Sequence, residues 1–417
     1  MNRSRNQRIS KRNQTLKRRI RRYLLLILGI GVLIVCLYTV WNFFGPIQTD
    51  QEIEQSTDRE LEKPSNQEAL DIGEKIVDRI GNQEPEIESE VVPKIEPEME
   101  TSERVNLAFV GDIMMGANVD KLLKKHGYDY PYLHISSLLQ EADIAAGNME
   151  NPITDRGEPV DNKTYVFRTS PEAVPEMVKA GFDLFNLANN HTLDYGLIGM
   201  QDTIRLLREA GLYGIGAGMN QEEAYEPAMI EKNGVRVAYI GLTKVVPTVS
   251  WKADKNIPGL AETYNHTRPI KAIESASEIS DMVVVMVHWG LEGETEARID
   301  ERELAHRYID AGADLVIGSH PHVLQGIESY KGKWIAYSLG NFIFTTSGRS
   351  GTKETAIIQA SCSKAGDCEL KVVPVLNGIA QPIQMEDEAA KVLYQQITEI
   401  SFSAEVHEDG SVHSLLQ

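Results

Sequence analysis

Five short apolar runs between residues 105 and 317 each end in side chains of the kind that bind metal ions or transfer protons. Amphipathic segments such as Leu197–Ala210 alternate with these runs, and alternating strand and helix patterns predict an α/β domain with parallel strands. The run Asp281–Val287 is almost wholly apolar, as in a strand buried on both faces of its sheet. Because parallel strands end at one edge of a sheet, the polar residues after them are expected to gather there.

The residues after these runs combine carboxylates, amides and imidazoles. They are Asp112 after Val105–Val110; Asn148 and Glu150 after Asp143–Ala146; Asn190, His191 and Asp194 after Phe182–Leu187; His288 and Glu292 after Asp281–Val287; and His320 and His322 after Asp314–Ile317. Such a mixture suits Zn, Mn or Fe better than Mg or Ca, which prefer oxygen ligands. The sequence therefore predicts a divalent metal site with enough ligands for two ions.

Each polar residue also has a simpler explanation. Asn190 and Asp194 could shape a turn or cap the following helix, and Glu150 could pair with a surface lysine. His288 could be a packing residue beside Trp289. Five strand ends with the same chemistry favour one shared site over five separate explanations.

The N-terminal region has a different composition from the rest of the chain, which carries a net charge of −19. Residues 1–22 hold ten Lys or Arg and no acid, and Tyr23–Phe44 is almost wholly apolar. The apolar stretch is long enough to span a bilayer, and the positive-inside rule places the basic residues in the cytoplasm. We expect a basic cytoplasmic segment at 1–22, a single-pass anchor in the cell membrane at 23–44, and an extracellular C-terminal part.

Two alternatives exist for this region. A cleaved signal peptide would be shorter and would end in a small-x-small site, which we do not find. The basic run could bind nucleic acid, but its place beside a spanning helix explains it, so no nucleic-acid partner is expected.

The remaining chain divides into three parts. Residues 45–104 carry 18 acidic and 6 basic residues, which predicts a disordered acidic stalk. The α/β pattern covers 105–385, and 386–417 is expected to be a C-terminal extension. Cys362 and Cys368 could close a small hairpin loop in an oxidising compartment or remain two free thiols.

Six motifs carry a family resemblance. They read F-V-G-D-I-M-M-G, G-N-M-E-N-P, A-N-N-H-T-L-D-Y-G, V-H-W-G, G-S-H-P-H-V-L-Q and Y-S-L-G-N-F-I-F, in order from Asn106 to Phe344. As a set they resemble the CapA family of poly-γ-glutamate capsule biosynthesis proteins, which is similar to the calcineurin-like metallophosphoesterases. The resemblance implies a metallophosphatase-like α/β sandwich of two mixed β-sheets flanked by helices around a dinuclear metal site, here preceded by one N-terminal transmembrane helix.

The resemblance also implies roles for these residues. Asp112 and His322 would bind the first metal, Glu150 would bridge both metals, and the second metal would be held by Asn190, His288 and His320. His191 would protonate the leaving group or stabilise the attacked centre, with Asp194 orienting it.

Two positions depart from the phosphoesterase pattern. Met114 stands where the pattern has a histidine ligand, and Glu150 stands where it has an aspartate. The first metal site is therefore expected to have fewer ligands than its counterpart in phosphoesterases.

The resemblance implies a membrane-anchored extracellular protein of poly-γ-glutamate synthesis or export. Its site would act as a metal-dependent hydrolase of the metallophosphoesterase type on poly-γ-glutamate or a related anionic substrate. Membrane subunits of a polyglutamate synthase would be its partners, and Asn148, Arg168, Lys244 and Glu292 are candidate substrate-binding residues. The alternatives are a non-catalytic scaffold or polymer-binding subunit, and a surface metallophosphoesterase.

Overall fold

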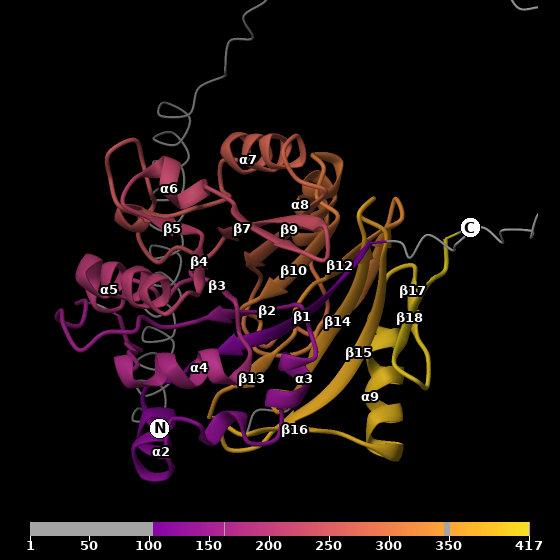
Figure 1. Ribbon diagram of the computed structural model, residues 1–417, viewed down its shortest axis with the longest axis horizontal. Helices are drawn as coiled ribbons and strands as arrows, with labels where there is room; N and C mark the ends of the chain where they lie inside the picture. Colours follow the sequence, from indigo (N-terminus) through magenta and orange to yellow (C-terminus); the bar gives the residue numbers. More distant parts are fainter. Residues whose placement is uncertain (1–102, 162, 346–350, 417) are drawn as a thin grey trace, which may run out of the picture. The chain divides into compact units, whose positions relative to one another are not determined.

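A computed structural model describes residues 103–161, 163–345 and 351–416. These residues form a mixed α/β fold in which two large sheets are flanked by helices (Figure 1). The expected cytoplasmic segment and membrane anchor, and all but the last two residues of the expected stalk, lie outside the described residues. Within the described part of the chain, no helix has the length and apolar character needed to cross a membrane.

The larger sheet has ten strands. Its main path runs through β17 (Ala404–Val406), β18 (Ser411–Ser414), β15 (Cys368–Asn377), β14 (Glu354–Ser363), β1 (Arg104–Ile113), β2 (Ile144–Met149), β3 (Leu184–Asn186) and β4 (Tyr213–Ile215), while β13 (Asn341–Ile343) pairs with β1 and β16 (Pro382–Gln384) with β15. Strands β1 to β4 are parallel, and β14 joins β1 in the antiparallel sense. The parallel half thus places the ends of β1, β2 and β3 at one edge.

The second sheet has six strands. Its order is β11 (Ile327–Tyr330), β12 (Lys333–Ala336), β10 (Leu315–Ser319), β9 (Met282–His288), β7 (Val235–Thr243) and β6 (Ala228–Lys232). Strands β12, β10, β9 and β7 are parallel. The β6–β7 hairpin turns at Asn233 and Gly234, which both have positive φ as a two-residue hairpin turn requires. A separate two-stranded sheet pairs β5 (Ala217–Gly218) with β8 (Gly259–Leu260).

All helices of the described residues except the last pack on the outer faces of the two large sheets, and the last packs on the core between them. The helices are α2 (Asn118–His126), α3 (Ser136–Gln140), α4 (Val174–Ala180), α5 (Gly196–Glu209), α6 (Gln221–Tyr225), α7 (Thr267–Ser277), α8 (Ile299–Asp310) and α9 (Asp387–Glu399), with 3₁₀ turns η1 (Tyr130–Tyr132), η2 (Pro171–Ala173) and η3 (Val249–Trp251). One core cluster joins α2 to α5 with the ten-stranded sheet, and another joins α6 to α8 with the six-stranded sheet. A third lies between the sheets and includes Phe109, Tyr239 and Val284.

The apolar runs indicated the strands but ended too early. Strands β1, β2 and β9 continue through Asp112, Asn148 and His288. These polar residues stay in the strands because a neighbouring strand pairs with each of them; Asp112, for example, lies opposite both Asn341 and Asn148. The three side chains are therefore held by sheet backbone and not by a loop.

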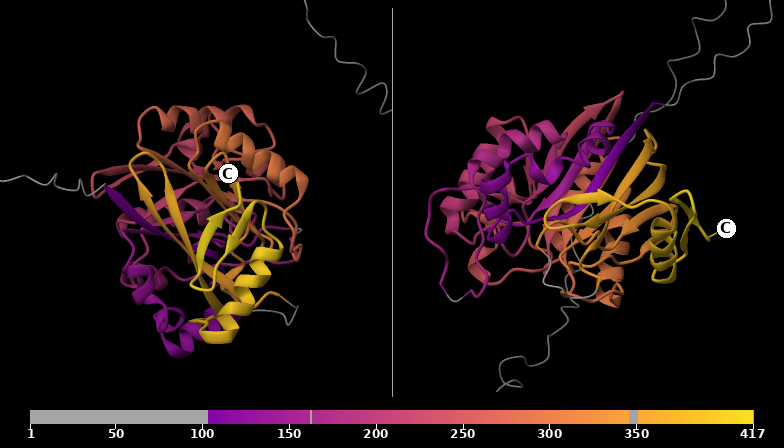
Figure 2. Two further views of the ribbon diagram at one scale, coloured as in Figure 1. Left: turned by 90° about the vertical axis from the view of Figure 1, so that its right-hand side faces the viewer. Right: turned by 90° about the horizontal axis from the view of Figure 1, so that it is seen from below.

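The C-terminal part of the chain is built into the larger sheet. The segment expected to be an extension forms α9, β17 and β18, and Figure 2 shows these yellow elements beside the strands β14 and β15. Cys362 and Cys368 face each other across β14 and β15 and form a disulfide with a Cα–Cα distance of 4.1 Å. Of the two states left open for these cysteines, the structure has the bridged one.

Candidate metal centre

The carboxyl ends of five strands from both large sheets meet in one buried cluster. Asn148 at the end of β2 joins the two sheets: its Nδ2 donates to Asp112 Oδ1 at 2.8 Å and lies 3.3 Å from His288 Nδ1. Asp112 Oδ2 lies 3.1 Å from His322 Nδ1, and Asn190 Oδ1 lies 2.8 Å from His288 Nε2. Residues separated by up to about two hundred positions in the chain thus become direct neighbours.

Two overlapping groups of side chains have the arrangement of metal ligands. One is Glu150, His320 and His322, and the other is Asp112, Glu150 and His288. In each group one ligand atom per residue lies within 4.8 Å of the others. Glu150 belongs to both groups, as a bridging carboxylate would. The rings of His288 and His320, which were expected to hold the same ion, have their centroids 4.6 Å apart.

Unpartnered polar atoms show that a cation fits this cluster. Both carboxylate oxygens of Glu150 and Nδ1 of His320 are buried without a hydrogen-bond partner. A buried carboxylate without partners is costly, and a divalent cation is the kind of group that compensates it. The donor set of carboxylates, imidazoles and one amide is that of Zn, Mn or Fe sites.

Burial and neighbouring charges shift the pKa values of Glu150 and of the three histidines in the cluster. Burial, and next the charge of Asp112, raise the pKa of Glu150 well above its usual value. Burial disfavours the charged form of His322, but the carboxylates of Glu150 and Asp112 outweigh it and raise its pKa to about 10. Burial lowers the pKa of His288 far below its ordinary value and that of His320 to about 3. The last two imidazoles are therefore neutral, which is the form that ligates metals.

Polar residues that sequence reasoning missed hold the ligands in place. Ser319 Oγ lies 3.1 Å from His288 Nδ1, and Asn341 Oδ1 lies 3.0 Å from His322 Nδ1. Such contacts orient a ligand ring and select its tautomer. Asn341 belongs to the Y-S-L-G-N-F-I-F motif and Ser319 to the G-S-H-P-H-V-L-Q motif, so those two motifs were the available signal.

The backbone is strained where two of the histidines project. His320 and His322 have φ angles of 100° and 60°, a region that residues other than glycine rarely adopt. Strain of this kind persists where the surroundings impose it and concentrates at functional sites. The turn through Pro321 therefore aims both rings at the cluster at a conformational cost.

The loop after β3 presents a second group of side chains. Asn189 Oδ1 accepts hydrogen bonds from the backbone N–H of His191 and Thr192, which fixes the turn. His191 Nδ1 lies 2.7 Å from Asp194 Oδ2, and Asp194 is fully buried. Because an ionised carboxylate only accepts, Nδ1 carries the hydrogen in this bond.

Lys163 completes this group and was not anticipated. Its Nζ contacts the backbone oxygen of Asn190, His191 Nδ1 at 2.9 Å and a carboxylate oxygen of Asp194. Burial lowers the pKa of the lysine, while Asp194 acts in the opposite direction. Lys163 lies in an irregular segment about thirty positions from its partners, so no local pattern in the sequence marked it.

The expected substrate-binding residues occupy different surroundings. Asn148 is 1 % exposed and supports Asp112, so it is not open to a large substrate. Arg168 is exposed with its guanidinium 4.6 Å from the ring of Tyr195, and Lys244 pairs with Asp300 at 2.8 Å. The exposed Glu292 makes no hydrogen bond or ion pair with the residues that the structure describes, but its charge contributes to raising the pKa of His322.

Comparison with known proteins identifies the family of this chain. Residues 106–346 match the family described as bacterial capsule synthesis protein PGA_cap. The chain is 35% identical over 312 residues to the PGA biosynthesis protein CapA of Bacillus subtilis (strain 168), covering 74% of this chain and 81% of that protein. It is 36% identical over 306 residues to the capsule biosynthesis protein CapA of Bacillus anthracis, covering 71% and 74%.

Among solved structures, a hypothetical protein from Thermus thermophilus aligns with a TM-score of 0.37 and 18% identity over 67% of this chain and 96% of that chain. The family match spans more than half of the sequence and includes the five strand ends that build the cluster. The chain belongs to the bacterial capsule synthesis protein PGA_cap family.

Proposed function

We propose that this protein takes part in the synthesis or export of a poly-γ-glutamate capsule as a metal-dependent hydrolase acting on the polymer or a related anionic substrate. The relatives from two Bacillus species are named for PGA and capsule biosynthesis, which supports the pathway. The metal-dependent chemistry rests on one observation about Glu150: its carboxylate is fully buried, lacks hydrogen-bond partners and belongs to both groups of potential ligands.

The residues of the cluster divide into ligands and supports. Asp112, Glu150, Asn190, His288, His320 and His322 would hold one or two divalent ions, of which Mn, Zn and Fe fit the donor set. When bound, such ions activate water and stabilise negative charge that develops on the substrate. Asn148, Ser319 and Asn341 keep the ligands oriented.

His191 is the proton-transferring residue of this proposal. Its Nδ1 is held by Asp194, and its Nε2 makes no hydrogen bond with another described residue, so Nε2 is the ring atom that can exchange a proton with the substrate. Asp194 and Lys163 are positioning residues, since both act through the ring of His191.

Membrane attachment and location belong to the same proposal. The basic segment 1–22 and the apolar stretch 23–44 support a single-pass anchor with the N-terminus in the cytoplasm. The Cys362–Cys368 disulfide supports an oxidising compartment for the folded domain, such as the cell exterior. An anchored domain outside the cell could contact both the emerging polymer and the membrane subunits of the synthase.

The test measures metal content and turnover on the full chain purified in detergent. Wild type, Asp112→Ala and His288→Ala are compared with His407→Ala, which alters an exposed histidine on the hairpin of β17 and β18. We expect stoichiometric metal in wild type and in His407→Ala, reduced metal in the other two variants, and metal-dependent shortening of poly-γ-glutamate followed by size-exclusion chromatography.

Three results would change this proposal. Wild type without stoichiometric metal would contradict the metal site. Metal without turnover would favour the polymer-binding subunit, an interpretation supported by Met114 at a position where phosphoesterases have a ligand. Rapid turnover of p-nitrophenyl phosphate with no effect on the polymer would favour a surface phosphoesterase.

A further inference from the structure

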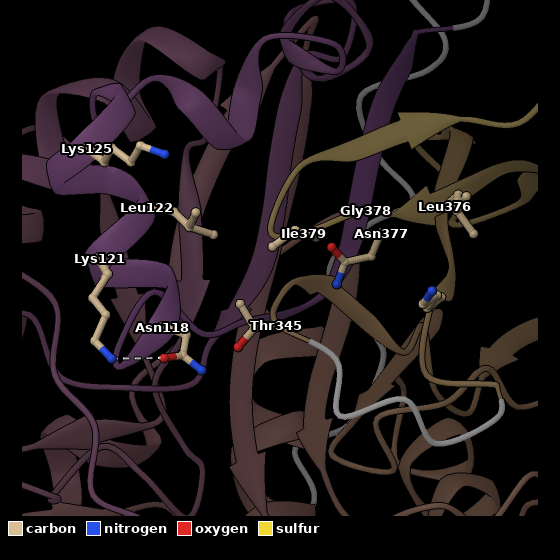
Figure 3. A pocket seen from close by; sticks show the side chains of 10 residues that line it. Asn118, Lys121, Leu122, Lys125, Thr345, Leu376, Asn377, Gly378 and Ile379 are labelled. Atoms are coloured by element: carbon tan, nitrogen blue, oxygen red, sulfur yellow. Dashed lines mark hydrogen bonds between the residues drawn. The ribbon is translucent and has the colours of Figure 1, made fainter.

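A pocket of about 650 Å³ lies outside the metal cluster, and none of its lining residues is a proposed ligand (Figure 3). One wall is the face of α2 that carries Asn118, Lys121, Leu122 and Lys125, and the opposite wall is the turn between β15 and β16. The positions on α2 have the i, i+3, i+4, i+7 spacing of a single helix face. Figure 3 shows these side chains across from Ile379 and Asn377, with Thr345 between them.

The pocket combines uncompensated positive charge with apolar surface. Among the described residues, Lys121 forms a hydrogen bond with the neutral side chain of Asn118 and no ion pair, and the side chains of Lys125 and Lys353 form neither. Lys124, which does not line the pocket, is paired with Asp120 at 2.7 Å. In a chain of net charge −19, a pocket with three such lysines is suited to an anion.

Apolar side chains lie between these charges. Ile379 is 68% exposed and Leu376 is 40% exposed, and both line the pocket together with Leu122. Large apolar side chains exposed together at a concave site mark a binding surface more often than isolated ones do. The occupant is therefore both anionic and partly apolar.

An amide oxygen without a hydrogen-bond partner indicates a third property of the ligand. Asn377 lines the pocket; its Nδ2 donates to the backbone oxygen of Phe344 at 3.2 Å, and its Oδ1 is buried without a hydrogen-bond partner. A buried amide oxygen without a donor is costly, and a ligand N–H would satisfy it. An occupant with amide groups thus fits better than a simple carboxylic acid.

The pocket is linked to the metal cluster through one residue. The ring of Phe344 packs 5.1 Å from that of His322, and the backbone oxygen of Phe344 also accepts a hydrogen bond from Ala380 N at 3.1 Å. The helix α2 begins six residues after Asp112. Phe344, which precedes the lining residue Thr345, therefore contacts the ligand His322 with its ring and the lining residue Asn377 with its backbone oxygen.

Resting on the proposed function, we infer that this pocket is a subsite that holds a stretch of poly-γ-glutamate beside the metal cluster. Each unit of that polymer carries a free carboxylate for a lysine, two methylene groups for the apolar surface and a backbone amide N–H for Asn377. A membrane surface with anionic headgroups shares the charge and the apolar character. It is disfavoured because a flat bilayer does not fill a concave pocket.

The test uses the full chain in detergent and end-labelled poly-γ-glutamate of defined length, with binding followed by fluorescence anisotropy. The triple variant Lys121→Gln/Lys125→Gln/Lys353→Gln is compared with Lys255→Gln/Lys271→Gln/Lys391→Gln, which removes the same charge from lysines that do not line the pocket. Exposed charge pairs contribute about two- to threefold each, so the pocket variant should bind about tenfold more weakly at low salt. The difference should shrink at high salt.

Additional measurements distinguish failure of the subsite from failure of the proposed function. Ile379→Ser should weaken binding by about threefold at every salt concentration, and thermal melting should show that all variants fold. If wild type binds the polymer and the pocket variant binds equally well, the subsite is wrong while the proposed function stands. If wild type does not bind the polymer, the proposed function fails as well. Loss of binding to phosphatidylglycerol vesicles with unchanged polymer affinity would make this face a membrane contact and overturn the subsite.

Discussion

Replacing Glu150 by glutamine should stabilise the metal-free protein and weaken its response to metal. The carboxylate is fully buried, neither oxygen has a hydrogen-bond partner, and the charge of Asp112 acts against it. Among the described residues, the nearest positive charge is His322 at 3.5 Å, which has a closer partner in Asp112 at 3.1 Å; His288 at 3.9 Å is neutral, and Lys163 acts on Glu150 only through its charge. A neutral amide of the same size removes the repulsion and can donate to Asp112.

The expected gain follows from the cost of an unsatisfied buried group, which is about 1–3 kcal/mol. For a domain of this size that corresponds to a rise in Tm of about 2–6 °C in the presence of a chelator. Metal at a thousand times its Kd would stabilise wild type by about 4.1 kcal/mol, which is more than the largest expected gain of the variant. The variant lacks the residue shared by both groups of ligands, so the order of the two melting temperatures should reverse when metal is added.

Thermal melting of the full chain with EDTA and with Mn²⁺ or Zn²⁺ measures both effects. Glu292→Gln is the matched control, because it makes the same substitution at an exposed neighbouring position and should change neither melting temperature by more than about 1 °C. A Glu150→Gln variant that melts below wild type in EDTA would refute the claim that the unpartnered carboxylate is a cost. Equal stabilisation of both proteins by metal would refute its role as a ligand.

Three further predictions concern parts of the molecule outside the ligand cluster. Lys163→Met should destabilise the protein by about 3 kcal/mol in urea unfolding while metal content is unchanged, because it leaves the buried Asp194 without its cation; a loss below about 1 kcal/mol would contradict this. The hydrogen bond from Arg156 lowers the pKa of Asp202 to about 2. Asp202→Asn should therefore lower the free energy of unfolding by about 2 kcal/mol above pH ~4, and the difference from wild type should disappear as the pH falls through about 2. A loss of stability that does not vary with pH would exclude this linkage. Replacing both cysteines of the disulfide by serine should cost about 2 kcal/mol, the value for a short closed loop, and added reductant should then destabilise wild type but not the variant.

The parts of the fold that the sequence could predict are those with a local pattern. The run Asp281–Val287 predicted a strand buried on both faces, and every residue of β9 is buried. Asn233-Gly234 is a dipeptide typical of two-residue hairpin turns, and it forms the turn between β6 and β7. Helix α7 was not among the elements expected from the sequence; Pro269 lies in its first turn, a position where proline is tolerated.

In the candidate site, too, the sequence could predict the residues that follow a local pattern but not those brought together by tertiary structure. Residues such as Asp112 and Glu150 could be predicted because each follows an apolar run, and the ends of parallel strands are brought together by the fold itself. The contacts of Lys163 and the pocket beside α2 depend on segments that meet only through tertiary structure. No composition or spacing within one segment contains that information.

The supports of the cluster are amides and a hydroxyl, and charge explains this choice. Asp112 and Glu150 already place two carboxylates in a buried region, so a third carboxylate behind a ligand would increase the repulsion that raises the pKa of Glu150. An amide can both donate and accept without adding charge. Asn148 uses its donor toward Asp112, and Asn341 uses its acceptor toward His322. The supporting residues therefore add no negative charge to the cluster. A bound cation would then supply the positive charge that allows both carboxylates to be ionised together.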